Sequence, residues 1–119
     1  MCKIIKIQKI DPEVYITVTD GLYEVVAFSD CDKFNIGEEL DNELKAFGAI
    51  NVMSSFDEEC LVKIIDSSSY LQHIVGVLTD RDLGIVHVGN IKIYVSDYIP
   101  KDINNGQFIE FDVARVDIW

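Results

Sequence analysis

Alternating apolar and polar residues flank an Asp-Gly pair near the start of the chain. Residues 14–19 alternate, Asp20-Gly21 suits a tight turn, and residues 22–28 run back, which predicts a β-hairpin. If Thr19 pairs with Leu22, the apolar side chains of both strands share one face. That register predicts a core face made of Val14, Ile16, Val18, Tyr23, Val25 and Ala27.

A second hairpin has the same design. Gly84 to Val88 lead into Gly89-Asn90, and Ile91 to Val95 return. This register places His87 and Lys92 together on the face opposite the apolar one. The paired apolar residues are Val86 with Ile93 and Val88 with Ile91.

The two hairpins occupy equivalent places in the sequence. Asp20-Gly21 matches Gly89-Asn90 at an offset of 69, and Gly37 matches Gly106 at the same offset. We interpret this as a weak internal duplication within a single domain, with halves 1–66 and 70–119. Chance similarity between two β-rich stretches is an equally good explanation.

The glycine after each hairpin opens a new segment. The segment after Gly106 alternates to Val113 and then changes phase, which predicts a long strand bent by a bulge. The segment after Gly37 fits a strand by analogy, but a short helix over residues 38–47 is the alternative. The other apolar runs are Ala49 to Met53, Cys60 to Ile65 and Leu71 to Thr79.

These segments predict an all-β fold with about eight or nine short strands and at most one short helix. A closed or partly open antiparallel barrel is the first interpretation because it removes exposed edges, and a β-sandwich is the second. The glycine-opened strands that follow hairpins resemble those of OB-fold barrels. That resemblance implies binding of oligonucleotides or oligosaccharides, by analogy of fold alone.

Charge changes this picture. The 119 residues carry 10 Lys and Arg against 21 Asp and Glu, a net charge of −11, and the first nine residues hold three of the lysines and no acid. Such a surface repels phosphate backbones, so we expect no nucleic-acid partner. It attracts basic proteins, although solubility alone also explains an acidic surface.

The cysteines and the first residues indicate the compartment. Three cysteines without a C-x-x-C pair do not form a disulfide framework. The lysines of the opening segment are spread among its apolar residues, unlike a signal peptide, and no apolar run approaches the roughly 18 residues of a membrane span. We expect a cytoplasmic protein without membrane contact.

No motif names a reaction, a metal or a cofactor. The carboxylate pairs Asp30-Cys31-Asp32 and Asp80-Arg81-Asp82 lack the later ligands of a calcium loop and suit β-turns better. His73 and His87 fall in separate strands without a zinc-ligand spacing. Lys92 beside His87 would disfavour the protonated imidazole.

The first hypothesis is therefore a non-enzymatic acidic module that binds, and by binding neutralises, a protein with a basic surface. Its candidate contact residues are Tyr15, Tyr94, Tyr98, Asp30, Asp32, Asp57, Glu58, Glu59 and Asp97. The alternative is a barrel that holds a small ligand or sugar, lined by Tyr15, His87 and Tyr94. A small enzyme comes third, and it requires His73 or His87 to meet two carboxylates in one cleft.

Overall fold

The all-β fold expected from the alternating pattern is confirmed. The structure, a computed structural model, describes residues 2–10, 13–30, 33–40, 44–66, 68–95 and 97–118, and every element in these ranges is a strand. The helix considered for residues 38–47 is wrong, since Glu39–Leu40 and Leu44–Phe47 are both strands. The strands are β1 (Cys2–Ile10), β2 (Glu13–Thr19), β3 (Glu24–Ser29), β4 (Glu39–Leu40), β5 (Leu44–Phe47), β6 (Ile50–Ser54), β7 (Leu61–Asp66), β8 (Leu71–Asp80), β9 (Ile85–Val88), β10 (Ile91–Val95), β11 (Phe108–Val113) and β12 (Arg115–Ile118).

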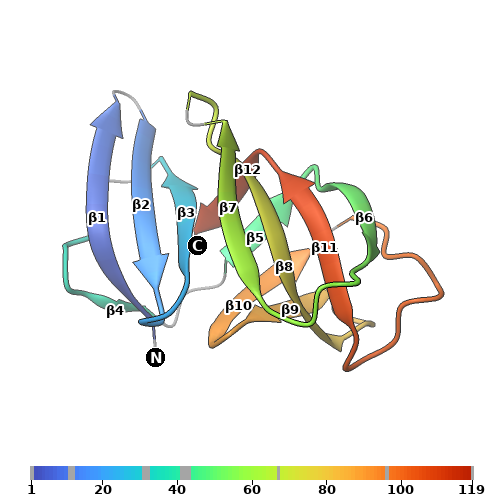
Figure 1. The fold of residues 1–119 in the computed structure, drawn as a ribbon. Helices are drawn as coiled ribbons and strands as arrows, with labels where there is room; N and C mark the ends of the chain where they lie inside the picture. Colours follow the sequence, from blue (N-terminus) through green and yellow to red (C-terminus); the bar gives the residue numbers. More distant parts are fainter. Residues whose placement is uncertain are drawn as a thin grey trace.

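All twelve strands belong to one sheet (Figure 1). Its order is β4-β1-β2-β3-β12-β5-β10-β9-β8-β11-β6, and β7 pairs with β8 beside this path. The sheet is not closed, because β4 and β6 form its two ends. The OB-like arrangement is therefore not confirmed in detail, and the expectation of purely antiparallel pairing needs correction at two places.

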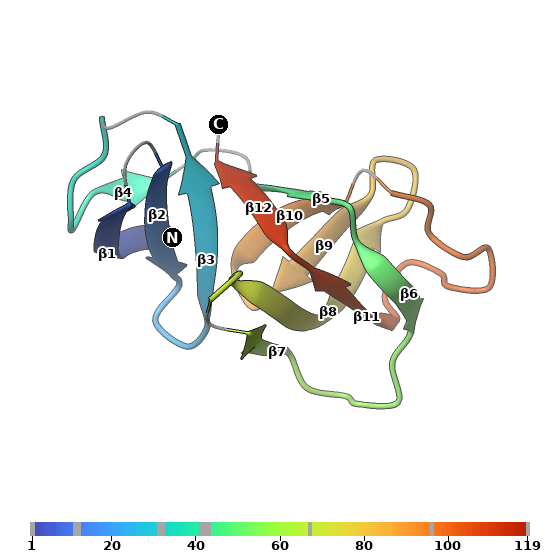
Figure 2. The same cartoon turned by 90° about the horizontal axis from the view of Figure 1, so that it is seen from above.

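The two parallel pairings join segments that lie far apart in the sequence. β5 runs parallel to β10, with Leu44 opposite Ile93, and β12 runs parallel to β3, with Asp117 opposite Phe28. β5 and β12 also pair with each other, antiparallel, with Ala46 opposite Val116. The early strand β5 thus extends the second hairpin, and the last strand extends the first hairpin (Figure 2).

The first hairpin has the expected faces in a different register. Thr19 pairs with Glu24 instead of Leu22, which leaves residues 20–23 as the loop. The Asp20 carboxylate accepts hydrogen bonds from the backbone N–H groups of Leu22 and Tyr23, at 2.9 and 2.8 Å. These bonds widen the turn. Because the register moves by two residues, the predicted apolar face still points into the core.

The second hairpin has the expected register, with Val88 opposite Ile91 and His87 opposite Lys92. Its turn meets the turn of the first hairpin, since Asp20 Oδ2 accepts a hydrogen bond from the Asn90 N–H at 2.9 Å. Burial alone would raise the pKa of Asp20. The hydrogen bonds from backbone N–H groups, that of Asn90 first, outweigh that burial, and the pKa of the carboxyl is lowered.

The two matching glycines open turns with the same hydrogen bonds. The Gly37 N–H donates to the Ile4 carbonyl at 2.7 Å, and the Gly106 N–H donates to the Leu78 carbonyl at 2.7 Å. Ile4 and Leu78 each donate in return to the residue after the glycine. Both glycines have positive φ, which explains their recurrence. The duplication of the two halves stays a prediction.

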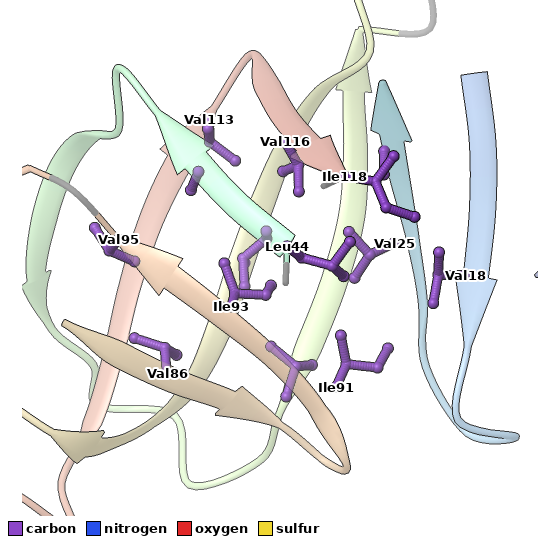
Figure 3. Packing of buried hydrophobic residues seen from close by; sticks show 14 of the residues in the cluster. Val18, Val25, Leu44, Val86, Ile91, Ile93, Val95, Val113, Val116 and Ile118 are labelled. Carbon is purple, nitrogen blue, oxygen red and sulfur yellow. The ribbon is translucent and has the colours of Figure 1, made fainter. Parts of the chain in front are cut away.

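The buried side chains form one cluster that runs from the first hairpin into the rest of the sheet. Val25 of β3 lies beside Ile118 of β12, and Leu44, Ile93 and Ile91 continue the cluster toward the second hairpin (Figure 3). The first hairpin and the exchanged strands therefore share a core, and neither buries its apolar face alone.

One buried polar residue ties β8 to β3. Gln72 is only 1% exposed. Its side-chain amide accepts a hydrogen bond from the Val26 N–H at 2.9 Å and donates one to the Val26 carbonyl at 3.0 Å. Among the described residues β12 pairs with β3 at Phe28, so Gln72 takes the place of a neighbouring strand for Val26.

Replacing Gln72 by leucine should lower the free energy of unfolding by about 1–3 kcal/mol, because both backbone groups of Val26 would lose their partner. Urea denaturation followed by circular dichroism measures this. The matched control is Gln8→Leu, at an exposed glutamine with a single hydrogen bond, from Tyr70. Equal stability of the two variants would contradict the role given to Gln72.

Candidate functional site

A cleft of about 730 Å³ lies between the first hairpin and β7. One wall is the outer face of β1, β2 and β3, which contributes every second residue of each strand. The other wall is β7 (Figure 1), which contributes the four consecutive residues 61–64. The first wall and its loop supply Lys6, Gln8, Tyr15, Thr17, Leu22, Tyr23, Glu24 and Val26, and Tyr70 completes the lining.

Two tyrosines form part of this lining. The rings of Tyr15 and Tyr70 stack with centroids 4.4 Å apart, and the Tyr70 hydroxyl donates to Gln8 Oε1 at 2.7 Å. Tyr70 has a φ of 54°, a conformation that is costly for a bulky side chain. The stack and the hydrogen bond hold Tyr70 in this conformation.

Tyr15 is fixed from two further sides. Its ring meets Phe28 edge to face at a centroid distance of 5.9 Å, and its hydroxyl donates to Glu13. The hydrogen bond to Glu13, followed by burial, raises the pKa of Tyr15. The phenol therefore stays protonated and the aromatic wall of the cleft is preorganised.

The cleft differs in charge from the rest of the molecule. Lys6 and Lys63 line it, and the side-chain ammonium group of neither forms a hydrogen bond or an ion pair with any residue that the structure describes. Glu24 is the one carboxylate among the described residues of its lining. The cleft is thus slightly positive in a protein with a net charge of −11.

The structure does not bring the three expected ligand-contacting residues together. Tyr15 lines the cleft, whereas His87 and Tyr94 belong to the second hairpin and are absent from its lining. Lys92 Nζ lies 5.2 Å from the centre of the Tyr94 ring. Tyr98 is 64% exposed in the segment that follows β10.

The expected acidic contact residues fall on separate surfaces. Asp57, Glu58 and Glu59 are exposed in the loop between β6 and β7, which bows away from the sheet (Figure 2). Asp30 is exposed at the end of β3, where it lines a small hollow with Arg115 and Asp117.

Asp97 is tied into the fold, because its Oδ2 accepts a hydrogen bond from the Ala49 N–H at 2.9 Å. Asp32 lies outside the described residues. The exposed loop at residues 57–59 is therefore the densest acidic surface among the expected contact residues that the structure describes.

Sequence reasoning missed a cluster around His73. Its Nδ1 lies 2.6 Å from Asp112 Oδ1, its Nε2 lies 3.5 Å from Glu110 Oε2, and Asn51 donates to Asp112 Oδ2 at 3.2 Å. Burial alone would raise the pKa of Asp112, but the contacts with His73 and Asn51 outweigh it and lower this pKa. The pairing of β8 with β11 brings His73 to the two carboxylates, and the pairing of β6 with β11 brings Asn51 to Asp112.

This cluster meets part of the condition set for an enzyme, a histidine with two carboxylates. His73 does not line the cleft between the first hairpin and β7. Within the described ranges no group of His, Cys, Asp and Glu residues could hold a metal ion. The contacts connect β6, β8 and β11 at the end of the sheet, where they stabilise strand pairing.

The Asp80-Arg81-Asp82 turn is structural. Asp80 Oδ1 accepts a hydrogen bond from the Leu83 N–H at 3.1 Å, as expected for a turn aspartate. The Arg81 guanidinium donates to the carbonyl oxygens of Ile99, Pro100 and Ile103, at 2.6 to 3.0 Å. This arginine holds the segment after β10 in place.

No known protein family, curated protein or solved structure matches the chain. The described residues include no helix that is long and apolar enough to cross a membrane. The function must therefore be argued from the surfaces of this protein.

The pKa of His87 is lowered by burial and, to a smaller extent, by Lys92, as the predicted register implied. Replacing Lys92 by methionine should raise this pKa, because the nearby positive charge is removed. An NMR titration of the imidazole measures the change. The control Lys101→Met, in an exposed loop, should leave the pKa of His87 unchanged. An identical effect of both variants would contradict the role of Lys92 in lowering this pKa.

Proposed function

We propose that the protein is a non-enzymatic interaction module that binds, and thereby neutralises, a partner protein with a basic surface. The observation that carries this proposal is the loop between β6 and β7. Phe56 is fully exposed there, and three carboxylates, Asp57, Glu58 and Glu59, follow it directly.

An exposed phenylalanine contributes no buried area to the fold. Burying such a side chain in an interface contributes about 1.5–3 kcal/mol, and aromatic residues are enriched at interface centres. A fully exposed Phe56 is therefore a suitable anchor for a partner.

The carboxylates beside Phe56 define the chemistry of the partner. Carboxylates around an apolar anchor attract lysine and arginine side chains and speed the encounter with a basic surface. The net charge of −11 acts in the same direction over longer distances. It also disfavours nucleic acids, whose phosphates would be repelled.

Capture of proteins on the immobilised full chain, with elution by a salt gradient and mass spectrometry, should identify a basic protein released at moderate salt. With the partner in hand, Phe56→Ala should weaken binding about tenfold or more. Neutralising Asp57, Glu58 and Glu59 together, as Asn, Gln and Gln, should reduce the dependence of the dissociation constant on salt.

Matched controls come from other exposed positions. Leu83→Ala removes an apolar side chain that is 63% exposed in a different turn, and Asp102→Asn removes an exposed charge elsewhere. Both should bind as the wild type does. A partner whose affinity is independent of salt and of Phe56 would contradict the proposal.

A further inference from the structure

The unpaired edges of the sheet differ in how well they are protected. β4 has only two residues, and β6 has an irregular pairing with β11 and a positive φ at Asn51. The free edge of β1 carries lysines, a common protection against strand addition. These three edges are short, irregular or charged.

β7 lacks this protection. It is six residues long, its residues 61–65 are apolar except for Lys63, and among the described residues it pairs only with β8. Leu61, Ile64 and Ile65 are between 42% and 50% exposed. β7 is therefore the edge most open to another strand.

The pairing pattern shows which backbone groups of β7 are free. Leu78 exchanges both backbone hydrogen bonds with residues 106 and 107, on the β11 side of β8. The N–H and C=O groups of successive residues point to alternate sides of a strand. Val75 and His73, at odd distances from Leu78, therefore direct these groups to the other side of β8, where β7 lies.

The register opposes Leu61 to Val75 and Lys63 to His73. These two β7 residues therefore bond to β8, and the N–H and C=O groups of Val62 and Ile64 point away from it. No hydrogen bond joins these outward groups to a described residue.

The cleft lies along this free edge. A strand that presents one face to a cleft contributes every second residue, as β1, β2 and β3 do, whereas β7 contributes residues 61–64 without a gap. The cleft therefore meets β7 along its edge, and it is open to a chain that runs beside the strand.

We propose that the cleft binds an extended segment of a partner protein, which adds to β7 as a further strand through the backbone groups of Val62 and Ile64. The inference rests on the proposed function only in that the natural occupant belongs to a partner protein. It does not require Phe56 or the acidic loop.

The side chains of the cleft define the segment. Cross-strand neighbours of Val62 and Ile64 should be apolar, and the neighbour on the side of Lys63 should be a carboxylate. Lys6, on the opposite wall, favours the same charge. The occupant is thus an alternating apolar and polar segment that carries an acidic residue and has no proline at its bonding positions.

The test uses phage-displayed random peptides of about ten residues, selected on the wild-type full chain and long enough to follow the six residues of β7. The selected peptides should alternate apolar and acidic residues. Val62→Pro should weaken their binding about tenfold or more, since it removes an outward N–H but no bond to β8. The matched control Val62→Ala, which keeps the N–H, should bind more tightly than Val62→Pro.

Thermal unfolding of each variant identifies any loss of folding, in which case Ile64→Pro and Ile64→Ala replace the first pair. Equal binding by the proline and alanine variants would overturn the proposal, as would a cleft that selects no peptide. A ligand held only by side chains, such as a sugar against Tyr15, would bind both variants equally and would also overturn it.

The variant Lys63→Glu provides a separate measure, because it should shift the selected peptides from acidic to basic residues. Phe56→Ala should leave peptide selection unchanged. If peptides are selected on the cleft but no basic protein is captured from the lysate, the proposed function is refuted and strand addition stands. If a basic protein is captured but the cleft selects no peptide, strand addition is refuted and the proposed function stands.

Discussion

The exchange of β5 and β12 is the constraint on which the rest of the structure depends. β5 runs parallel to β10 of the second hairpin, and β12 runs parallel to β3 of the first, so each pairs with a hairpin from the other half of the sequence. β5 and β12 also pair with each other at Ala46 and Val116. Neither hairpin can bury its apolar face in a two-stranded unit. β1 and β8 flank the outer strands of the two hairpins, and the exchanged pair joins β3 to β10, so the two hairpins are held at fixed positions in one sheet around a common core.

That constraint also produces the cleft. Because β12 pairs with β3 at Phe28, the β3 backbone at Val26 needs another partner, and the buried amide of Gln72 on β8 provides it. The same contact brings β8, and with it β7, next to the outer side of the first hairpin. Tyr70 in its strained conformation then joins Tyr15 and Gln8 across the gap. The geometry of the cleft is thus a consequence of how strand pairing ends on β3.

The alternation of the hairpins was enough to predict strands, faces and, for the second hairpin, the register. The register of the first was missed by two residues because the bonds to the Asp20 carboxylate depend on local geometry that a turn motif does not specify. Parallel pairing between Leu44 and Ile93 leaves no local pattern, so the exchange could not be predicted. For the same reason the sequence predicted Tyr15 as a site residue but missed Lys6, Lys63 and Tyr70, and also the contact between His73 and Asp112.

The distribution of charge separates the two proposed surfaces. Asp57, Glu58 and Glu59 follow an exposed aromatic residue on a loop, whereas Lys6 and Lys63 line opposite walls of a cleft that has one carboxylate among its described residues. A basic surface and an acidic extended segment are different ligands, yet one partner protein can present both. The loop spans residues 55–60, and Glu59 stands two residues before Leu61, the first residue of β7, so the acidic residues lie close to the free edge in the sequence. Long-range attraction by the acidic loop would therefore bring a partner to the strand where backbone hydrogen bonds can form, and the two contacts would act in sequence along one segment of the chain.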